Sequence, residues 1–175
     1  PDERVTQGTL QEISKESFGL LNVMILIRLS GLTEPPSKAG RRLFGNSDEL
    51  FLQSRPKRGL LTPKEVRSLA LAELSLCSTS TVWDVGAGSG SLAIEAARLA
   101  PNGSVYAIEM DVDDHQLIEE NAARFGVDNL QAILGQAPEA WSDLPDPDSI
   151  YVGGSGRAVT SLVEQAWERL KPGGR

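Results

Sequence analysis

The sequence predicts an α/β protein built around a parallel, doubly wound sheet. Strand-like and helix-like segments alternate along residues 81–170, separated by short joints rich in Gly, Pro and Asn. A group of glycines directly follows the first of these strands, where the chain passes into a helix. Ligands of such sheets bind beyond the carboxyl ends of the strands, so candidate functional residues are expected there.

The first helix of this alternating region has clear start signals. Thr62 is the expected N-cap, Pro63 fits the first helical position, and Glu65 completes a capping box with Thr62. We expect this helix to run to about Leu76.

Hydrophobic periodicity and breaker residues define the elements that follow. The expected strands are residues 81–85, 104–109, 130–134 and 149–152, and the expected helices are about residues 91–99, 113–125 and 158–170.

The N-terminal region has a different character. Residues 8–16 are polar and compatible with a helix, and the apolar, β-branched run at 18–27 is expected to be a buried strand. The longest apolar stretch, residues 20–29, contains Asn22 and Arg28 and has half the length of about 20 residues that a membrane helix needs. No membrane partner is expected.

Length and composition favour one folded domain with part of a second. The chain has 175 residues, of which 40% are hydrophobic and 23% charged, which excludes a disordered chain. The net charge is −7; residues 1–67 carry 11 basic and 8 acidic side chains, and residues 68–175 carry 6 and 16. This acidity argues against a nucleic-acid partner.

Cysteine and targeting signals favour the cytoplasm. Cys77 is the single cysteine, which excludes an internal disulfide framework and a CxxC zinc knuckle, and no export signal is visible. The chain begins at Pro1 and stops in a turn at residues 171–175, so we expect a fragment of a longer protein.

The glycine loop Gly86-Ala87-Gly88-Ser89-Gly90 is the most informative segment. Glycines let the backbone approach a ligand, and the following helix N-terminus favours anions. The dinucleotide fingerprint requires Gly or Ala where this chain has Ser91, so the match to a nicotinamide site is imperfect. With Asp84 two residues before Gly86, the loop instead resembles motif I of S-adenosylmethionine-dependent methyltransferases.

Two later residues fit the same cofactor. Glu109 ends the second strand, where a carboxylate accepts the hydroxyls of a ribose; the alternative is a solvated acid at a strand end. Ala137 follows the third strand, where methyltransferases of this fold contact adenine through backbone groups; the alternative is a plain turn.

Several motifs together resemble the decarboxylating precorrin methyltransferases of cobalamin biosynthesis. They are Arg58-Gly59-Leu60-Leu61-Thr62, residues 83–90, residues 105–109, residues 137–140, Gly153-Gly154-Ser155-Gly156 and residues 170–175. The resemblance covers residues 44–175, and its most specific parts are residues 59–62 and 153–156. It implies the Rossmann-like fold of class I methyltransferases, with S-adenosylmethionine as cofactor and S-adenosylhomocysteine as product.

The resemblance also assigns roles to residues. Its cofactor contacts fall on Thr62, Gly86, Ala87, Gly88, Ser89, Gly90, Glu109 and Ala137. Its substrate contacts are expected at Gly153, Gly154, Ser155 and Gly156, with Arg58 in a basic cluster that suits a substrate with many carboxylates. The alternatives are a capping role for Thr62, a flexible loop at 153–156 and a solvated linker around Arg58.

The implied activity is methylation of carbon 15 of a precorrin or cobalt-precorrin, coupled to decarboxylation of an acetate side chain. Residues 1–30 resemble the end of a tetrapyrrole methylase domain fused upstream, residues 31–54 have linker composition, and residues 55–175 form the methyltransferase domain. The family's fold has about three further strands after Gly174, so the fourth strand is expected to be an exposed edge. Single-domain relatives form symmetric oligomers, so the resemblance also implies a homo-oligomer.

Other functions remain open at this point. They are a methyltransferase of the same fold acting on RNA or protein, a non-catalytic docking domain and, more distantly, a nicotinamide oxidoreductase. His115 is the only histidine and fits a surface helix, and the sequence offers neither a catalytic dyad nor a metal-ligand set. No catalytic residue is assigned.

Overall fold

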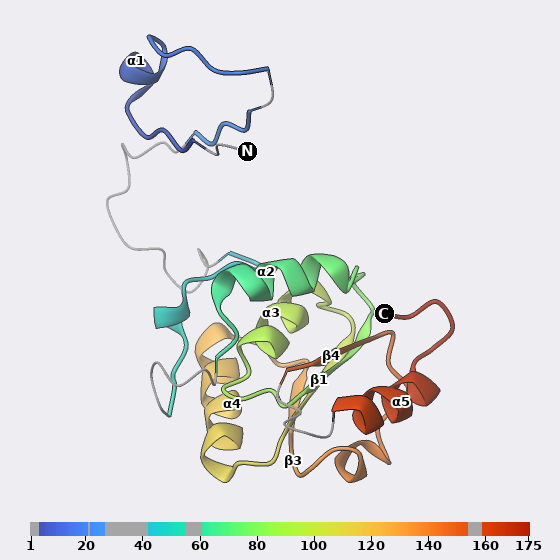
Figure 1. The fold of residues 1–175 in the computed structure, drawn as a ribbon. Helices are drawn as coiled ribbons and strands as arrows, with labels where there is room; N and C mark the ends of the chain where they lie inside the picture. The colour runs from blue at the N-terminus through green and yellow to red at the C-terminus, as the bar shows by residue number, and fades with distance from the viewer. Residues whose placement is uncertain (1–3, 21, 27–41, 55–60, 154–158) are drawn as a thin grey trace. The chain divides into compact units, whose positions relative to one another are not determined.

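The computed structural model describes residues 4–20, 22–26, 42–54, 61–153 and 159–175 (Figure 1). The chain divides into two compact units, residues 1–35 and 36–175. We describe each unit separately.

The described part of the first unit is exposed. Its helix α1 (Leu10–Ile13) is shorter than the predicted segment, and Thr9 and Glu12 form a reciprocal capping box at its start. The buried strand predicted at residues 18–27 is wrong for the described residues, which form no strand. Val23 and Ile25 are 91% and 80% exposed, and among the described residues of this unit no strand pairs with them.

The second unit contains the predicted parallel sheet. Its strands are β1 (Thr81–Val85), β2 (Ser104–Glu109), β3 (Leu130–Leu134) and β4 (Ser149–Val152), in the spatial order β3-β2-β1-β4. Every pairing is parallel, and Val85 lies level with Ile108 and Val152. The carboxyl ends of the strands therefore meet at one edge, as predicted.

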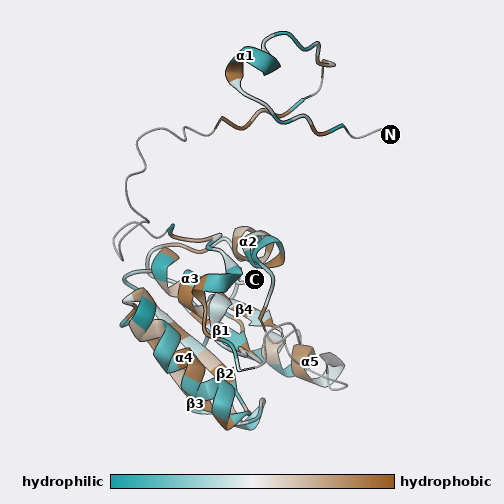
Figure 2. Cartoon of the chain, turned by 90° about the vertical axis from the view of Figure 1, so that its left-hand side faces the viewer, coloured by the Kyte–Doolittle hydropathy of each residue, from teal (hydrophilic) through white to brown (hydrophobic). Residues whose placement is uncertain are grey.

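Helices cover both faces of this sheet (Figures 1 and 2). Successive strand residues point to opposite faces, so Val82 packs in the cluster beneath α2 (Lys64–Glu73), α3 (Ser91–Leu99) and α4 (Val112–Phe125). Trp83 packs on the other face with α5 (Val159–Arg169) and the short helix η3 (Glu139–Trp141). This layering confirms the doubly wound arrangement.

The start of α2 differs from the prediction. The helix begins at Lys64, with Pro63 in the N-cap position and no side-chain cap, so Thr62 does not cap it and forms no capping box with Glu65. The Asp48 carboxylate accepts a hydrogen bond from the Lys64 N–H at 3.4 Å instead. The helix also ends at Glu73 rather than Leu76, because Ser75 takes a positive φ of 51°.

Part of the predicted linker belongs to the second unit. Asn46 and Phe51 are 3% and 4% exposed, and the 3₁₀ helix η2 (Asp48–Leu50) lies between them. The Phe51 ring stacks on Phe125 of α4 with 4.5 Å between centroids. Linker composition did not reveal this, because an Asn and a single aromatic ring carry little periodic signal.

The fourth strand is not a fully exposed edge. Ile150 N–H donates to the Arg175 carbonyl at 2.7 Å, and Arg175 N–H donates to the Asp148 carbonyl at 3.1 Å. The last residues of the chain thus lie along β4 and satisfy part of its outer edge.

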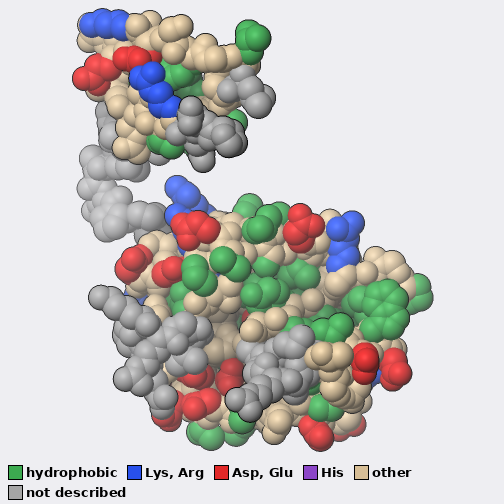
Figure 3. All heavy atoms as spheres, in the orientation of Figure 1, with side chains coloured by type: hydrophobic (Ala, Val, Ile, Leu, Met, Phe, Trp, Pro, Cys, Tyr) green, Lys and Arg blue, Asp and Glu red, His purple; other side chains and the backbone are tan. Residues whose placement is uncertain are grey.

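The surface of the second unit mixes charged and apolar side chains. On α2, Val66 and Leu69 are exposed, and Figure 3 shows hydrophobic side chains among charged ones over this area. Among the described residues, no helix is both long and apolar enough to cross a membrane.

Candidate cofactor and substrate site

The glycine loop is fastened over the end of β2. Gly86 and Ala87 N–H both donate to the Ile108 carbonyl, at 2.9 and 3.1 Å. Gly86, Gly88 and Gly90 have φ of 73°, 54° and 79°, a region that disfavours a side chain. At Gly90 an added Cβ would also lie 3.0 Å from Ile118, so this close packing of loop and α4 needs glycine.

The carboxylate of Glu109 lies against this loop. Its Oε2 accepts the Gly88 N–H at 2.8 Å, and its Oε1 accepts the N–H groups of Met110 and Asp111 at 2.8 and 3.0 Å. A carboxylate oxygen accepts about two hydrogen bonds, so Oε2 retains capacity for one more donor. Glu109 is 9% exposed, and its carboxylate lies beside the glycine loop at the end of β2.

Asp84 lies beneath the loop and is buried. Its Oδ2 accepts the Ala93 N–H of α3 at 3.0 Å. The pKa of Asp84 is raised to about 7, chiefly by burial; the hydrogen bond from Ala93 lowers it, and the negative charge of Glu109 adds a smaller rise. The carboxyl end of the sheet therefore holds two acids, Asp84 and Glu109.

Ser89 has a buried hydroxyl without a partner. The residue is 2% exposed, and among the described residues its Oγ has no hydrogen-bond partner. An unpaired buried hydroxyl costs free energy unless a ligand or water completes it. In a loop of glycines beside a carboxylate, this group is a candidate donor to a ligand.

The other predicted cofactor residues, Ala137 and Thr62, lie on segments outside this loop. Ala137 is half-buried beyond β3, where Gly135 N–H donates to the Glu109 carbonyl at 2.9 Å. Thr62 is half-buried before α2, and its carbonyl accepts a hydrogen bond from Arg67 Nη1 at 2.6 Å.

One of the predicted substrate residues is visible at the same edge. Gly153 N–H donates to the Val85 carbonyl at 2.9 Å, and an added Cβ would lie 3.2 Å from the Gly86 carbonyl. Gly154, Ser155, Gly156 and Arg58 lie outside the described residues.

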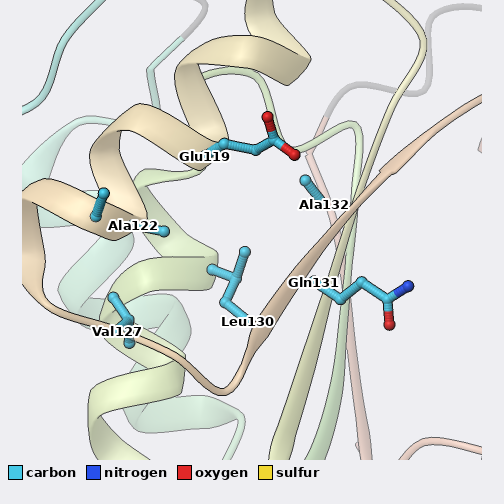
Figure 4. A pocket seen from close by; sticks show the side chains of 7 residues that line it. Glu119, Ala122, Val127, Leu130, Gln131 and Ala132 are labelled. Carbon is cyan, nitrogen blue, oxygen red and sulfur yellow. The ribbon is translucent and has the colours of Figure 1, made fainter.

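A separate hollow of about 530 Å³ lies between α4 and β3 (Figure 4). Ala122, Val127 and Leu130 form its apolar lining, with Glu119 and Gln131 at its sides. It includes neither the glycine loop nor Glu109. Within the described residues, no group of His, Cys, Asp and Glu is arranged to hold a metal ion.

Comparison with known proteins matches this chain to a family. Residues 56–175 match the family described as "Precorrin methyltransferase domain". The chain belongs to this precorrin methyltransferase family. The resemblance that the sequence motifs indicated is thereby confirmed.

Relatives in the family cover different parts of the chain. It is 39% identical over 173 residues to the "Precorrin-6Y C(5,15)-methyltransferase [decarboxylating]" of a Sinorhizobium species, covering 99% of this chain and 40% of that protein. It is 41% identical over 128 residues to the "Cobalt-precorrin-6B C(15)-methyltransferase (decarboxylating)" of Salmonella typhimurium, covering 73% of this chain and 65% of that protein. The chain thus spans less than two thirds of the length of both relatives.

Solved structures confirm the fold. The crystal structure of a precorrin-6Y C5,15-methyltransferase from Geobacter metallireducens aligns with a TM-score of 0.71 and 36% identity, over 76% of this chain and 69% of that one. The predicted Rossmann-like fold of class I methyltransferases is thus confirmed for this family member.

Sequence reasoning missed a buried ion pair beside the site. Arg67 of α2 and Glu95 of α3 are both fully buried, and Arg67 Nε donates to Glu95 Oε2 at 3.0 Å. A glutamate inside the apolar run of residues 91–99 was the available signal, because such a charge is rarely buried without a partner.

Sequence reasoning also missed Asn121 of α4. This residue is fully buried, and its side chain bonds both the glycine loop and residue 52. An asparagine on an otherwise regular helix carries no signal for such a role.

Proposed function

We propose that this protein transfers a methyl group from S-adenosylmethionine to carbon 15 of a precorrin or cobalt-precorrin and decarboxylates an acetate side chain of the same macrocycle, in cobalamin biosynthesis. The observation that carries the proposal is the Glu109 carboxylate, held at 2.8 Å from Gly88 N–H beside the glycine loop of a precorrin methyltransferase family member.

The residues present fit this cofactor. Glu109 Oε2 keeps room for a ribose hydroxyl, Ser89 Oγ is buried without a partner among the described residues, and Gly88 leaves the backbone open to close approach. Thr62 and Ala137 complete the proposed cofactor contacts. When bound, S-adenosylmethionine supplies an activated methyl group, and S-adenosylhomocysteine leaves.

The chain contributes mainly binding and orientation. Glu109 would bond the ribose, and the loop would place the methyl donor at the carboxyl edge. Gly153 lies on the same edge, where a Cβ added to it would be 3.2 Å from the Gly86 carbonyl oxygen. A large flat ring is proposed to approach over Gly153, Gly154, Ser155 and Gly156, with Arg58 attracting its carboxylates. Holding the two reactants in line supplies much of the acceleration.

The two bond changes balance within the substrates. The macrocycle carbon supplies the electron pair of its new bond to the methyl group, the pair of the broken carbon–sulfur bond stays on sulfur, and the ring releases one proton. Loss of the acetate carboxyl group as CO₂ leaves an electron pair on the conjugated ring, which takes up one proton.

A tetrapyrrole acceptor is favoured over RNA or protein by the names of the relatives and by the acidity of residues 68–175, with 6 basic and 16 acidic side chains. The intact loop and Glu109 disfavour a non-catalytic docking domain.

The Sinorhizobium relative matches 99% of this chain within 40% of its own length, which supports an upstream fused tetrapyrrole methylase domain ending near residue 30. The proposal also places the protein in the cytoplasm and includes assembly into a homo-oligomer.

The test is methyl transfer measured by mass spectrometry. The protein is incubated with S-adenosylmethionine and the precorrin or cobalt-precorrin substrate, with and without cobalt, and with an RNA pool as the competing acceptor. The expected product has gained one methyl group and lost one CO₂. Methylated RNA with an unchanged macrocycle would overturn the proposal.

A further inference from the structure

Asn121 connects two segments that are far apart in the sequence. Its Oδ1 accepts the Leu52 N–H at 2.8 Å, and its Nδ2 donates to the carbonyls of Leu52 and Ser89, each at 3.0 Å. Both hydrogens of the amide are thereby used, and the residue is 0% exposed.

One of the two segments is residues 45–54, which we call the strap. Gly45 and Asn46 N–H groups donate to Glu95 of α3, and the Asn46 carbonyl accepts a 2.6 Å hydrogen bond from Arg67 of α2. The strap therefore has its own anchors on α2 and α3 that do not involve Asn121.

The other segment is the glycine loop. Within the loop, the Gly90 N–H donates to the Ala87 carbonyl at 2.9 Å, which holds the nitrogen side of the peptide between Ser89 and Gly90. The hydrogen bond from Asn121 to the Ser89 carbonyl holds the oxygen side of the same peptide, so that its orientation is fixed from both sides. Among the described residues, Asn121 is the side chain that bonds both the loop and the strap.

We propose that Asn121 is a positioning residue for cofactor binding. It holds the Ser89 peptide, so that the glycine loop keeps the conformation in which its backbone is open to the ligand. This inference rests on the proposed function. Asn121 acts through the loop, so its loss weakens cofactor affinity and leaves the rate at saturating cofactor nearly unchanged.

The chain offers a matched control in Asn129. Its Nδ2 is within hydrogen-bond distance of the carbonyls of Ala97, Ala100 and Gly103, at 3.1, 2.8 and 3.4 Å, next to the amino ends of β2 and β3. Asn129 therefore joins backbone segments as Asn121 does, but away from the glycine loop. A purely structural role predicts the same behaviour for both residues.

The experiment compares Asn121→Asp with Asn129→Asp. Both changes keep the side-chain shape and replace an amide donor with an oxygen that faces carbonyl oxygens. Calorimetry measures S-adenosylhomocysteine affinity, denaturation measures stability, and methyl transfer gives KM for S-adenosylmethionine and kcat. Should Asn121→Asp not fold, Asn121→Ser and Asn129→Ser replace the pair.

We expect Asn121→Asp to weaken S-adenosylhomocysteine about tenfold or more and to raise KM equally, with kcat within about twofold. Asn129→Asp is expected to lower stability but to keep affinity within about twofold. Equal affinities in the two variants would overturn the positioning role. Absence of binding by the unsubstituted chain would instead overturn the proposed function, and with it this inference.

Discussion

The two edges of the sheet are built in opposite ways. At the amino edge, backbone groups are paired and packed: Asn129 bridges three carbonyls, and an added Cβ on Gly103 would lie 2.0 Å from the Ser80 carbonyl oxygen. At the carboxyl edge, the Ser89 hydroxyl has no partner among the described residues, and Asp84 is a buried acid. The amino edge thus serves stability, whereas the carboxyl edge keeps polar capacity for a ligand.

The largest expected effect is at the amino edge, in Gly103→Ala. Its methyl group would overlap the Ser80 carbonyl, which is backbone and cannot move aside, so we expect a loss of about 2–4 kcal/mol in the free energy of unfolding. Urea denaturation measures this loss. If the two edges have separate roles, the folded fraction still binds S-adenosylhomocysteine with unchanged affinity, and a weaker affinity would contradict the separation.

The next effect concerns the pH dependence of stability at the two edges. Burial raises the pKa of Asp84 to about 7, so between about pH 4 and pH 7 the unfolded chain has lost a proton that the folded chain keeps. The Asp84 contribution to stability therefore decreases as pH rises through this window and stays constant above it. We expect Asp84→Asn to remove this decrease, so that its stability relative to the unsubstituted chain rises between pH 5 and pH 8 in denaturation curves.

Asp148 at the amino edge provides the contrast. Burial raises its pKa, but hydrogen bonds from Thr81 N–H and Lys171 outweigh burial, and the net pKa is lowered. Its contribution is present above the ordinary pKa of an aspartate and is lost as pH falls through the lowered value. Asp148→Asn should therefore lose stability at neutral pH and not at strongly acid pH. The same pH trend in both variants would contradict the comparison.

The smallest expected effect is in Ser89→Ala. Because Ser89 Oγ has no partner among the described residues, its removal should change the free energy of unfolding by less than about 0.5 kcal/mol. We expect S-adenosylhomocysteine to bind several-fold more weakly if the hydroxyl bonds the ligand. Calorimetry and denaturation on the same preparation separate these two results, and a large loss of stability without a loss of affinity would assign Ser89 to the core.

The sheet and its helices were predictable because local signals agree there with tertiary packing. Strands such as β1 have a full apolar face, and their joints carry Gly, Pro or Asn, so all four strand ranges match the prediction. The glycine loop and Glu109 were predictable because spacing along a parallel sheet brings successive strand ends together.

The remaining features depend on contacts between distant segments. Phe51 is buried only because Phe125 of α4 lies beside it, and Asn121 acts only because Leu52 and Ser89 meet there. The apolar run near residue 25 resembles a strand in composition, but pairing partners decide whether a strand forms. Thr62 matched a capping pattern, yet Asp48, 14 residues earlier, bonds the first helical N–H instead.

The most direct test of the central claim is calorimetry of S-adenosylhomocysteine against this chain and its Glu109→Ala variant, with NADH as the control ligand. The ribose is proposed to bond the Glu109 carboxylate, and a hydrogen bond to a charged group contributes about 1.5–3 kcal/mol, so the variant should bind about tenfold or more weakly while NADH does not bind either chain. Equal affinity of both chains for S-adenosylhomocysteine would contradict a cofactor site at the carboxyl edge.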